Sequence, residues 1–310
     1  MAQISPIKFS KELQKQLFPD NEFYKYSRTE TGIGPDVENV EIPVSGDVGR
    51  ASSGDPVSLP LPILEREDTK KSYPVEQLYT SPYLVRNEES IVLNYDKLTD
   101  VASSLANSIN ERAGDIAATE WGSTANVVLT TGSARNAYVT GTTGTRKAIN
   151  KANMLSVKKA FNKMNLPNRG KNSLYGLLTA EQVEDLLGIA DFVDYDKTGE
   201  LSKLRDGEIA YIMGFNLMMR TAHNYSNGVM YNAAGTAKRT VDETLLATDS
   251  PAAIFWHRSM VRHAEGNAKT FINRDQAAYL GGTILSSVVR FGATFDRPDE
   301  KGIVALVEAT

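Results

Sequence analysis

The sequence predicts an α+β protein, because helices and strands are both expected and do not alternate in the regular order of a βαβ fold. A long amphipathic helix is expected at residues 94–121, and apolar strand-like runs gather in the last third of the chain. Seven of the twelve prolines fall between Pro35 and Pro82, so that part cannot be the middle of a hydrogen-bonded sheet. No internal repeat is visible.

The composition is that of a globular protein with one large core or two ordinary ones. The chain has 310 residues, of which 41% are hydrophobic. It has no cysteine, which excludes disulfides, thiolate metal sites and cysteine nucleophiles. The net charge of -4 argues against a protein that coats nucleic acid but permits local basic patches. We expect no signal peptide, because no apolar segment follows a basic start at the N-terminus. We expect no membrane span, because the longest nearly apolar run, Ile209 to Met219, is too short and contains Asn216.

Residues 1–36 are expected to form an arm. A short helix is predicted from Ser10 to Phe18, where Pro19 stops it, but its leucines alone cannot give it a core. The residues that follow mix aromatic, charged and turn residues without periodicity. We therefore expect the arm to need a partner surface to become ordered.

Residues 37–80 are expected to form a long hairpin. Val40, Ile42 and Val44 alternate with polar neighbours, a tip rich in glycine and serine follows, and a return run passes Tyr73. An isolated two-stranded hairpin is marginally stable in water. Either the rest of the chain or another subunit must therefore cover this hairpin.

The helix at residues 94–121 is the longest predicted element. Asn94 is suited to cap it, and Gly114 is its one weak point, costing up to about 1 kcal/mol relative to alanine. Its predicted apolar stripe consists of Leu98, Val101, Leu105, Ile109, Ala113 and Ile116, widened by Ala102, Ala106 and Ala117. Those expected to pack it onto strands are Leu98, Leu105, Ile109 and Ile116.

A second helix is predicted from Lys147 to Leu166, after a strand or loop at residues 125–144. Its buried stripe is expected to be Met154, Val157, Phe161 and Met164. A strand at residues 173–178 should lead to a helix that Thr179 caps and that runs to Gly188.

The remaining strands are predicted at residues 209–218, 252–256, 269–272, 283–295 and 302–307. In the fourth of these, one face should carry Leu285, Val289, Phe291 and Phe295. The last is apolar throughout, so we expect it to be buried on both sides.

The stretch from Asp194 to Arg205 is the nearest approach to a chemical motif. Asp196 begins DKTGE, similar to the phosphorylated aspartate motif of ion-pumping ATPases, but the partner motif and membrane helices of such pumps are missing. Asp194, Asp196 and Gly199 also open like an EF-hand loop, yet Arg205 stands where a bidentate Glu should close the calcium shell. We favour a solvated turn. An enzyme with an unrecognised site in this region is the alternative from another functional class.

Two further patterns have ordinary explanations. Gly141 to Lys147 resembles a phosphate loop only loosely, because Ala148 stands where a magnesium-binding hydroxyl belongs. A flexible loop capping the second helix is preferred. The three histidines, His223, His257 and His263, lack the spacing of a metal site on a helix and are expected to be surface or locally hydrogen-bonded residues.

Basic residues form the only notable charge cluster in the sequence. They are Arg146, Lys147, Lys151, Lys158, Lys159, Lys163, Arg169 and Lys171. The preferred interpretation is the solvated face of an amphipathic helix. The alternative is contact with an acidic partner or with enclosed nucleic acid.

Taken in order, these elements resemble the major capsid protein of tailed bacteriophages, the Hong Kong 97 type. VENVEIPVSG at residues 37–46 and the stretch from Tyr79 to Gly122 resemble the family's extended loop and spine helix. NSLYGLLTAEQVEDLLG at residues 172–188 is similar to its strand-then-helix element, and residues 250–309 are similar to its closing passage. The resemblance lies in the order of the elements and in their residue patterns, and it covers nearly the whole chain.

The resemblance implies a Hong Kong 97-like domain organisation. The parts would be an N-terminal arm (1–36), an extended loop (37–80), a peripheral domain with the spine helix (81–125), an axial domain (126–265), and peripheral strands with the C-terminus (266–310). The protein would be structural and non-enzymatic, with no catalytic, cofactor-binding or metal-binding residues. It would lie in the virion after assembly in the host bacterial cytoplasm.

The resemblance also implies partners. Copies would form the hexamers and pentamers of an icosahedral head around double-stranded DNA, which they would touch by non-specific contact, with a portal and, in some heads, a decoration protein. An encapsulin-like compartment shell, which uses the same fold without DNA, is the alternative. No membrane is involved.

Two variations within the family can be weighed on this sequence. The arm begins at Met1 without a long helical precursor, so a separate scaffolding protein is expected. Some members cross-link their shells by isopeptide bonds between Lys and Asn, which a buried Glu on a C-terminal strand assists. Lys70 and Lys71 lie on the hairpin, but Thr283 to Phe295 has no acidic residue before Asp296, so covalent cross-links are not expected.

Overall fold

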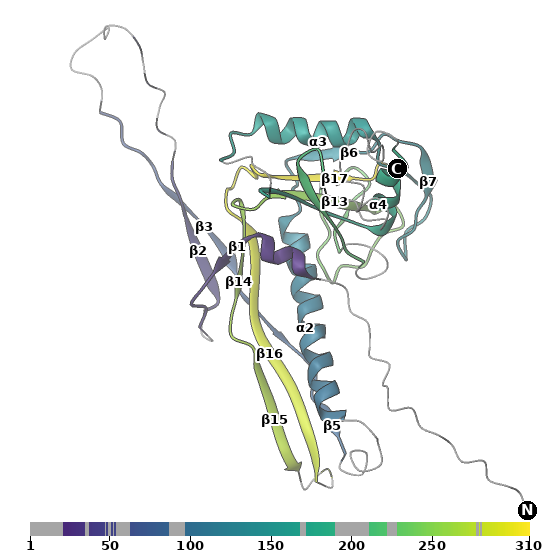
Figure 1. The fold of residues 1–310 in the computed structure, drawn as a ribbon. Coiled ribbons are helices and arrows are strands. Elements are labelled where there is room, and N and C mark those ends of the chain that lie inside the picture. Colours follow the sequence, from purple (N-terminus) through teal and green to yellow (C-terminus); the bar gives the residue numbers. More distant parts are fainter. Residues whose placement is uncertain are drawn as a thin grey trace, which may run out of the picture.

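Two sheets and one long helix make up the body of the protein, and a two-stranded hairpin projects from it (Figure 1). This computed structural model describes residues 21–34, 37–46, 48, 51, 53, 63–86, 97–167, 172–189, 211–221, 228–276, 279 and 281–310. The mixture of helices and strands confirms the α+β class. The predicted helix from Ser10 to Phe18 and the proposed cap Asn94 lie outside the described residues.

The six-stranded sheet is built around β16 (Gly282–Phe295). Its antiparallel partners are β14 (Val261–Glu265), β15 (Lys269–Gln276), β4 (Glu76–Tyr79) and β5 (Tyr83–Val85). β1 (Arg28–Glu30) adds to β14 in parallel. The predicted apolar face of β16 is confirmed, because Leu285, Val289 and Phe291 are buried.

The long helix α2 (Lys97–Trp121) lies along this sheet and continues to the other one (Figure 1). The four residues expected to pack it onto strands do so, Leu105 and Ile109 buried and Leu98 and Ile116 partly buried. Ala106 is exposed, so the prediction that it widens the stripe is wrong.

Gly114 is not the weak point of α2 that helix propensity predicts. A Cβ built on it would lie 2.3 Å from Asn21 Oδ1 and 2.9 Å from Arg220 Nη2. Asn21 Nδ2 donates to the helix carbonyl of Asn110 (2.9 Å), and Arg220 Nη2 donates to that of Glu111 (3.2 Å). The glycine therefore lets two polar side chains reach the helix backbone.

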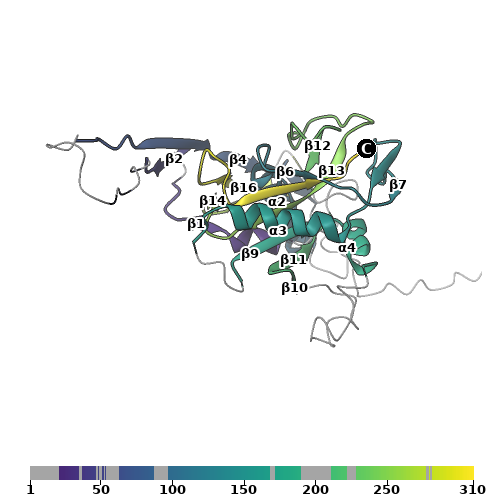
Figure 2. The same ribbon diagram turned by 90° about the horizontal axis from the view of Figure 1, so that it is seen from above.

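The seven-stranded sheet forms the core of the upper half in Figure 1. Its strands run in the order β10 (Tyr211–Ile212), β11 (Phe215–Met219), β9 (Leu174–Leu178), β13 (Ser250–His257), β17 (Ile303–Val307) and β6 (Val127–Leu129), with β12 (Met230–Tyr231) paired to β13. α3 (Lys151–Lys163) and α4 (Ala180–Leu187) cover one face (Figure 2), and the end of α2 packs on the other. Every residue of β13 and β17 is buried, which confirms the prediction for the last strand.

The two shorter helices begin at capping boxes. Thr179 caps α4, as predicted. The cap of α3 is Asn150, whose side chain accepts from the backbone N of Asn153 (2.9 Å), so the predicted helix start at Lys147 is wrong. The polar side chain of Asn150 stops the helix from extending further toward the N-terminus because it takes the place of a preceding turn.

Two loops were predicted differently from the structure. Thr145 to Lys147 form β8, which pairs with β7 (Ala134–Asn136), so the segment from Gly141 to Lys147 closes a small hairpin and does not cap α3. The single strand predicted at residues 209–218 is a hairpin between β10 and β11. Its turn residues Met213 and Gly214 have φ of 49° and 90°, a turn that the apolar run conceals.

Residues 21–34 are held by the chain itself. The 3₁₀ helix η1 (Glu22–Tyr26) inserts Phe23, which is 2% exposed, beside the rings of Trp121 (5.7 Å between centroids) and Trp256 (6.3 Å). The expectation that the arm needs a partner surface is therefore wrong for this part. Residues 1–20 lie outside the described chain.

The sheets do not divide the chain at one point. β14 follows β13 closely in sequence but belongs to the six-stranded sheet, and β17 follows β16 but belongs to the seven-stranded one. The chain therefore crosses between the sheets twice in its last sixty residues, counted from Ser250 on.

Candidate assembly surfaces

The hairpin formed by β2 (Asn39–Val44) and β3 (Thr69–Pro74) is covered only at its base. There Ile42, Tyr73 and Val75 form a small buried cluster with Ala264. Farther out the described apolar side chains are bare: Ile63 is 94% exposed, Leu64 79% and Val48 68%. Large apolar side chains exposed on a projecting segment mark an interaction surface.

Lys71 ties the base of this hairpin to the end of β16. Its Nζ donates to Phe295 O (2.6 Å) and lies 3.1 Å from the centre of the Phe295 ring. Burial lowers the pKa of Lys71 to about 8, against the opposing attraction of Asp296 and other carboxylates. Lys70 points the other way, to an exposed pair with Glu41 (2.7 Å).

An ion-pair network whose centre, Arg262 and Asp296, is largely buried lies next to Lys71. Arg262 donates from Nη2 to Asp296 Oδ2 (2.9 Å) and also pairs with Glu30 of β1. Arg28 reaches the same carboxylate at 3.1 Å. The hydrogen bond with Asp296 raises the pKa of Arg262. The network therefore fastens β1 to β14 and to the end of β16, beside the point where the hairpin leaves the body.

β15 is a bare strand at the edge of the six-stranded sheet. Phe271 is 57% exposed and Ile272, on the opposite face of the strand, is 46% exposed. Unpaired backbone groups at such an edge invite another strand, and charged residues are one ordinary protection against this. β15 carries the exposed charges Lys269 and Arg274, but the apolar side chains between them are also exposed. A groove of about 350 Å³ adjoins the strand and is lined by Ile33, Phe271 and Arg290 among others.

The residues singled out as candidate chemical sites do not come together. Asp194 to Arg205, like His223, lie outside the described residues. Arg146 is 2% exposed, and its guanidinium donates to backbone carbonyls, among them Asp249 O (2.8 Å), so it cannot serve a phosphate loop. Within the described chain no group of three His, Asp or Glu side chains could hold a metal ion.

The two described histidines are buried and hydrogen-bonded. Ser259 N donates to His257 Nδ1 (3.2 Å), and His263 Nδ1 lies 2.7 Å from Ser27 Oγ. Burial lowers the pKa of His263. For these two residues the surface alternative is wrong, and local hydrogen bonding is confirmed for His257.

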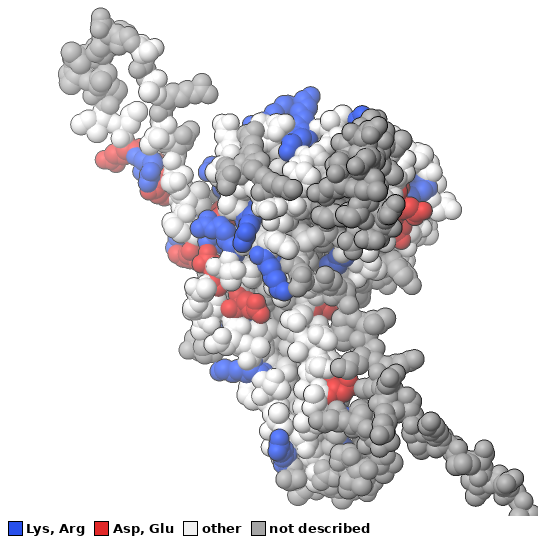
Figure 3. Space-filling model, viewed as in Figure 1, with Lys and Arg blue, Asp and Glu red and all other residues white. Residues whose placement is uncertain are grey.

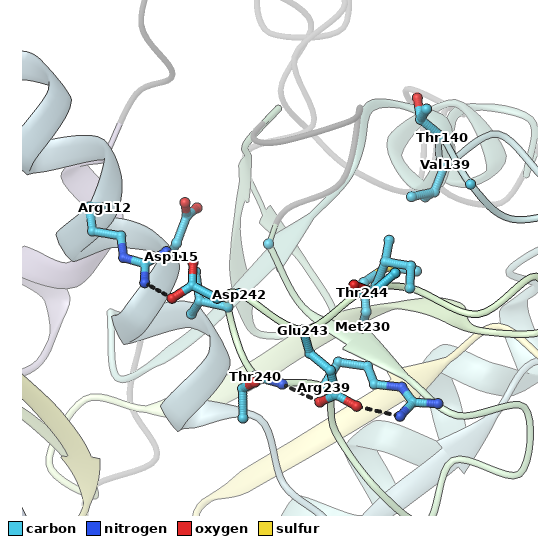
Figure 4. A pocket seen from close by; sticks show the side chains of 14 residues that line it. Arg112, Asp115, Val139, Thr140, Met230, Arg239, Thr240, Asp242, Glu243 and Thr244 are labelled. Carbon is cyan, nitrogen blue, oxygen red and sulfur yellow. Dashed lines mark hydrogen bonds and ion pairs between the residues drawn. The ribbon is translucent and has the colours of Figure 1, made fainter.

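A hollow of about 430 Å³ lies between α2 and the loop at residues 239–245 (Figure 4). Arg112 pairs with Asp242 across it, donating from Nη1 at 2.7 Å, and Arg239 pairs with Glu243. The charges that point into this hollow therefore satisfy one another, which is typical of a structural network.

Glu308 is a buried carboxylate that the sequence patterns did not reveal. Its Oε1 accepts from Tyr138 Oη (2.9 Å) and Gln182 Nε2 (3.0 Å) and pairs with Arg135. Burial raises the pKa of Glu308, although Arg135 opposes the shift. The side chain joins β17 to α4 and to the β7 loop, and a lone acidic residue directly after a fully apolar strand was the available signal.

Among the described residues, no helix has both the length and the apolar character that crossing a membrane requires. The surfaces with bare apolar groups are thus the hairpin, β15 and single side chains elsewhere. They suit contacts with other protein chains better than small-molecule chemistry.

Comparisons with known proteins agree with this picture. A family model described as phage capsid protein matches residues 96–308. Similar solved structures include Mycobacterium phage Che8 (17% identity, TM-score 0.67, covering 98% of this chain and 97% of that one) and the capsid of cyanophage P-SCSP1u (14%, 0.68, 97% and 92%). The mature capsid of bacteriophage PhiM1 is similar at 12% identity, with a TM-score of 0.66 and 98% and 92% covered. No curated protein matches.

Proposed function

The chain belongs to the phage capsid protein family and is a major capsid protein that forms a phage head, and we propose that its copies complete one another through the hairpin and β15. Its fold is that of the Hong Kong 97-like capsid proteins. The family match favours a phage head over an encapsulin-like compartment and gives no support to an enzyme centred on Asp194 to Arg205.

The observation that carries the proposal is the bare apolar surface on both elements. The chain's own fold leaves Ile63 and Leu64 on the hairpin mostly exposed. It leaves Phe271 and Ile272 on β15 about half exposed. If the hairpin of one copy lies on a different surface of the next, the contact is heterologous, and such contacts close into rings and shells. Obligate contacts of this kind bury about 2,000 to 5,000 Å².

For the rest of the assembly we propose what the family resemblance implies. The rings are hexamers and pentamers, a separate scaffolding protein and a portal guide their closure in the host cytoplasm, and the finished shell touches packaged double-stranded DNA without sequence preference. A decoration protein completes some heads of this type. The chain itself performs no catalysis.

The division into domains also remains a proposal. We divide the chain into an arm (1–36), an extended loop (37–80), a peripheral part (81–125 and 266–310) and an axial part (126–265). Strand pairing supports moving one strand from each of the last two parts to the other. Val261–Glu265 joins the peripheral sheet, and Ile303–Val307 joins the axial sheet.

The proposal is tested by replacing Ile63 and Leu64 together with serine. We expect a folded, soluble subunit that no longer forms shells, because the apolar contact is lost while the body is untouched. Negative-stain microscopy and sedimentation velocity measure shell formation, and circular dichroism measures folding. A matched control exchanges the residues for isomers, Ile63→Leu with Leu64→Ile, and should assemble normally. Normal shells from the serine variant would overturn the hairpin's role.

A further inference from the structure

The exposed face of α3 carries a charge imbalance that the proposed contacts between subunits do not use. Between Glu120 and Glu181 the chain contains no Asp or Glu at all, although its net charge is -4. The basic residues of this acid-free segment are Arg135, Arg146, Lys147, Lys151, Lys158, Lys159, Lys163, Arg169 and Lys171. A local positive surface on an acidic protein is a candidate site for a polyanion.

The structure sorts these residues by accessibility. Arg146 is buried among carbonyl groups, and Lys158 lies over the Phe215 ring at 5.2 Å. Lys151, Lys159 and Lys163 are exposed on one side of α3. Figure 3 shows blue basic side chains at the top of the molecule, where α3 lies in Figure 1. The accessible part of the cluster is therefore a stripe along one helix.

The stripe is held in place by the opposite side of the same helix. Met154, Val157 and Phe161 are at most 1% exposed in the core between α3 and the seven-stranded sheet, and Asn150 caps the first turn. A helix rises 1.5 Å per residue, so Lys159 and Lys163 lie about 6 Å apart along the axis and the whole stripe spans about 18 Å. The helix carrying the positive groups is therefore fixed to the body of the subunit.

We propose that this face of α3, through Lys151, Lys159 and Lys163, binds the phosphate backbone of double-stranded DNA inside the head. The inference rests on the proposed function, which places DNA within the shell, and adds the surface that meets it. Double-stranded DNA carries one negative charge for about every 1.7 Å of its axis, so a stripe of this length can face several phosphates at once.

The residue types on the stripe favour binding without sequence preference. Lysine acts as a point charge toward phosphate and lacks the planar fork with which arginine reads guanine edges. Contacts to phosphate position a duplex but carry no sequence information directly. Each copy needs only weak affinity, because many identical copies act on one DNA molecule and their contacts add as avidity.

An acidic polypeptide is the competing occupant. Leu155 stands among the lysines and is 51% exposed, which would suit an amphipathic acidic helix. The continuous run without acidic residues and the polar neighbours Ser156 and Asn162, both exposed, favour DNA instead. A side chain that anchors a partner helix would need further apolar neighbours, and along the exposed side of α3 Leu155 has only Ala152.

The test uses the unassembled full-length chain and a 30-base-pair duplex of random sequence as the probe. Fluorescence anisotropy measures the binding constant at several salt concentrations. Each phosphate contact contributes about -0.9 to the slope of log K against log salt. We expect a slope near -3 for the wild type, a loss of about one contact for Lys159→Gln, and loss of measurable binding when Lys151, Lys159 and Lys163 are all changed to Gln. Lys269→Gln, at an exposed lysine on β15, is the matched control and should behave as the wild type.

Two outcomes would overturn the inference. One is DNA binding that the triple variant retains, and the other is a wild-type chain that ignores DNA but binds poly-glutamate through the same lysines. Shell formation by the triple variant, seen by negative-stain microscopy, separates this failure from failure of the proposed function. Normal shells without α3-dependent DNA binding would contradict only the proposal that α3 binds DNA. Absence of shells from the wild type would contradict the capsid function itself.

Discussion

The two sheets of this protein differ in how completely their own chain covers them. In the seven-stranded sheet, β13 and β17 are buried along their whole length between α3 and α4 on one side and α2 on the other. In the six-stranded sheet, β15 leaves apolar side chains bare on both faces. The fold itself covers the seven-stranded sheet, whereas neighbouring subunits are proposed to cover β15. Stability and assembly should therefore respond to mutations in different halves.

Two phenylalanines provide the sharpest contrast. Phe255 on β13 is 0% exposed, and Phe271 on β15 is 57% exposed. Phe255→Ala should lower the free energy of unfolding by about 3 to 5 kcal/mol, because it leaves a cavity in a packed core. Phe271→Ala should change it by less than about 0.5 kcal/mol. Urea denaturation of the unassembled chain, followed by circular dichroism, measures both.

Assembly should show the opposite order for the same pair. Under conditions where the remaining folded fraction is equal, Phe271→Ala should reduce the yield of shells more than Phe255→Ala does. Equal losses of stability at the two positions would mean that β15 is covered within the subunit, and the contrast between the sheets would collapse.

Gly114 in α2 gives the next largest expected effect. Gly114→Ala should destabilise the fold by about 1 to 3 kcal/mol, because the new methyl group meets the side chains of Asn21 and Arg220. Helix propensity alone would predict a gain of about 1 kcal/mol. Thermal unfolding decides the sign. Ala106→Gly on the exposed side of the same helix is the control, and it should cost only the propensity difference.

Lys71 makes the hairpin base sensitive to pH. Burial lowers its pKa from 10.5 to about 8 in the folded chain. Between those values the unfolded state binds more protons, so stability should rise with pH from about 8 to 10. Compared with Lys71→Met, the wild type should gain free energy of unfolding over this range in urea titrations. A difference that stays constant with pH would contradict the burial of the ammonium group.

The smallest effect is expected at the exposed ion pair of the same hairpin. Lys70→Ala breaks its contact with Glu41, but both side chains are more than half exposed. Surface pairs of this kind contribute about 0 to 1 kcal/mol. Thermal unfolding at low and at high salt should show a difference near zero. A large loss would indicate that the hairpin is more rigid, and less dependent on neighbours, than its exposure suggests.

Local patterns predicted the elements whose packing is periodic. The stripe of α2, the Thr179 cap of α4, and strands β16 and β17 all follow from the spacing of their apolar residues and from local hydrogen bonding. The resemblance to a capsid family rested on the order of such elements. The sequence alone thus indicates part of the candidate surfaces, namely the long hairpin and the basic residues of α3.

Long-range contacts explain what the patterns missed. Phe23 is held by Trp121 and Trp256, which are distant in sequence, so the segment around it shows no periodicity of its own. Arg146 counts as a surface charge in the sequence but is satisfied by the carbonyls of residues about a hundred positions away. By helix propensity Gly114 would weaken α2, but the side chains of Asn21 and Arg220 occupy the space that a Cβ would need. In each case the outcome depends on contacts with residues that are distant in sequence, and the local spacing of residues does not specify those contacts.

The late position of β16 and β17 in the chain has a consequence for synthesis. β16 pairs with most strands of the six-stranded sheet, and β17 separates β13 from β6 in the other sheet. The first sheet therefore has a gap until Phe295 has emerged from the ribosome, and the second until Val307 has emerged. Of the two proposed assembly surfaces, β15 therefore has no pairing strand until β16 is made, so this surface is completed late in translation. Nascent chains arrested after Gly281 should be cut readily by protease, and a compact, resistant nascent chain at that length would contradict this delay.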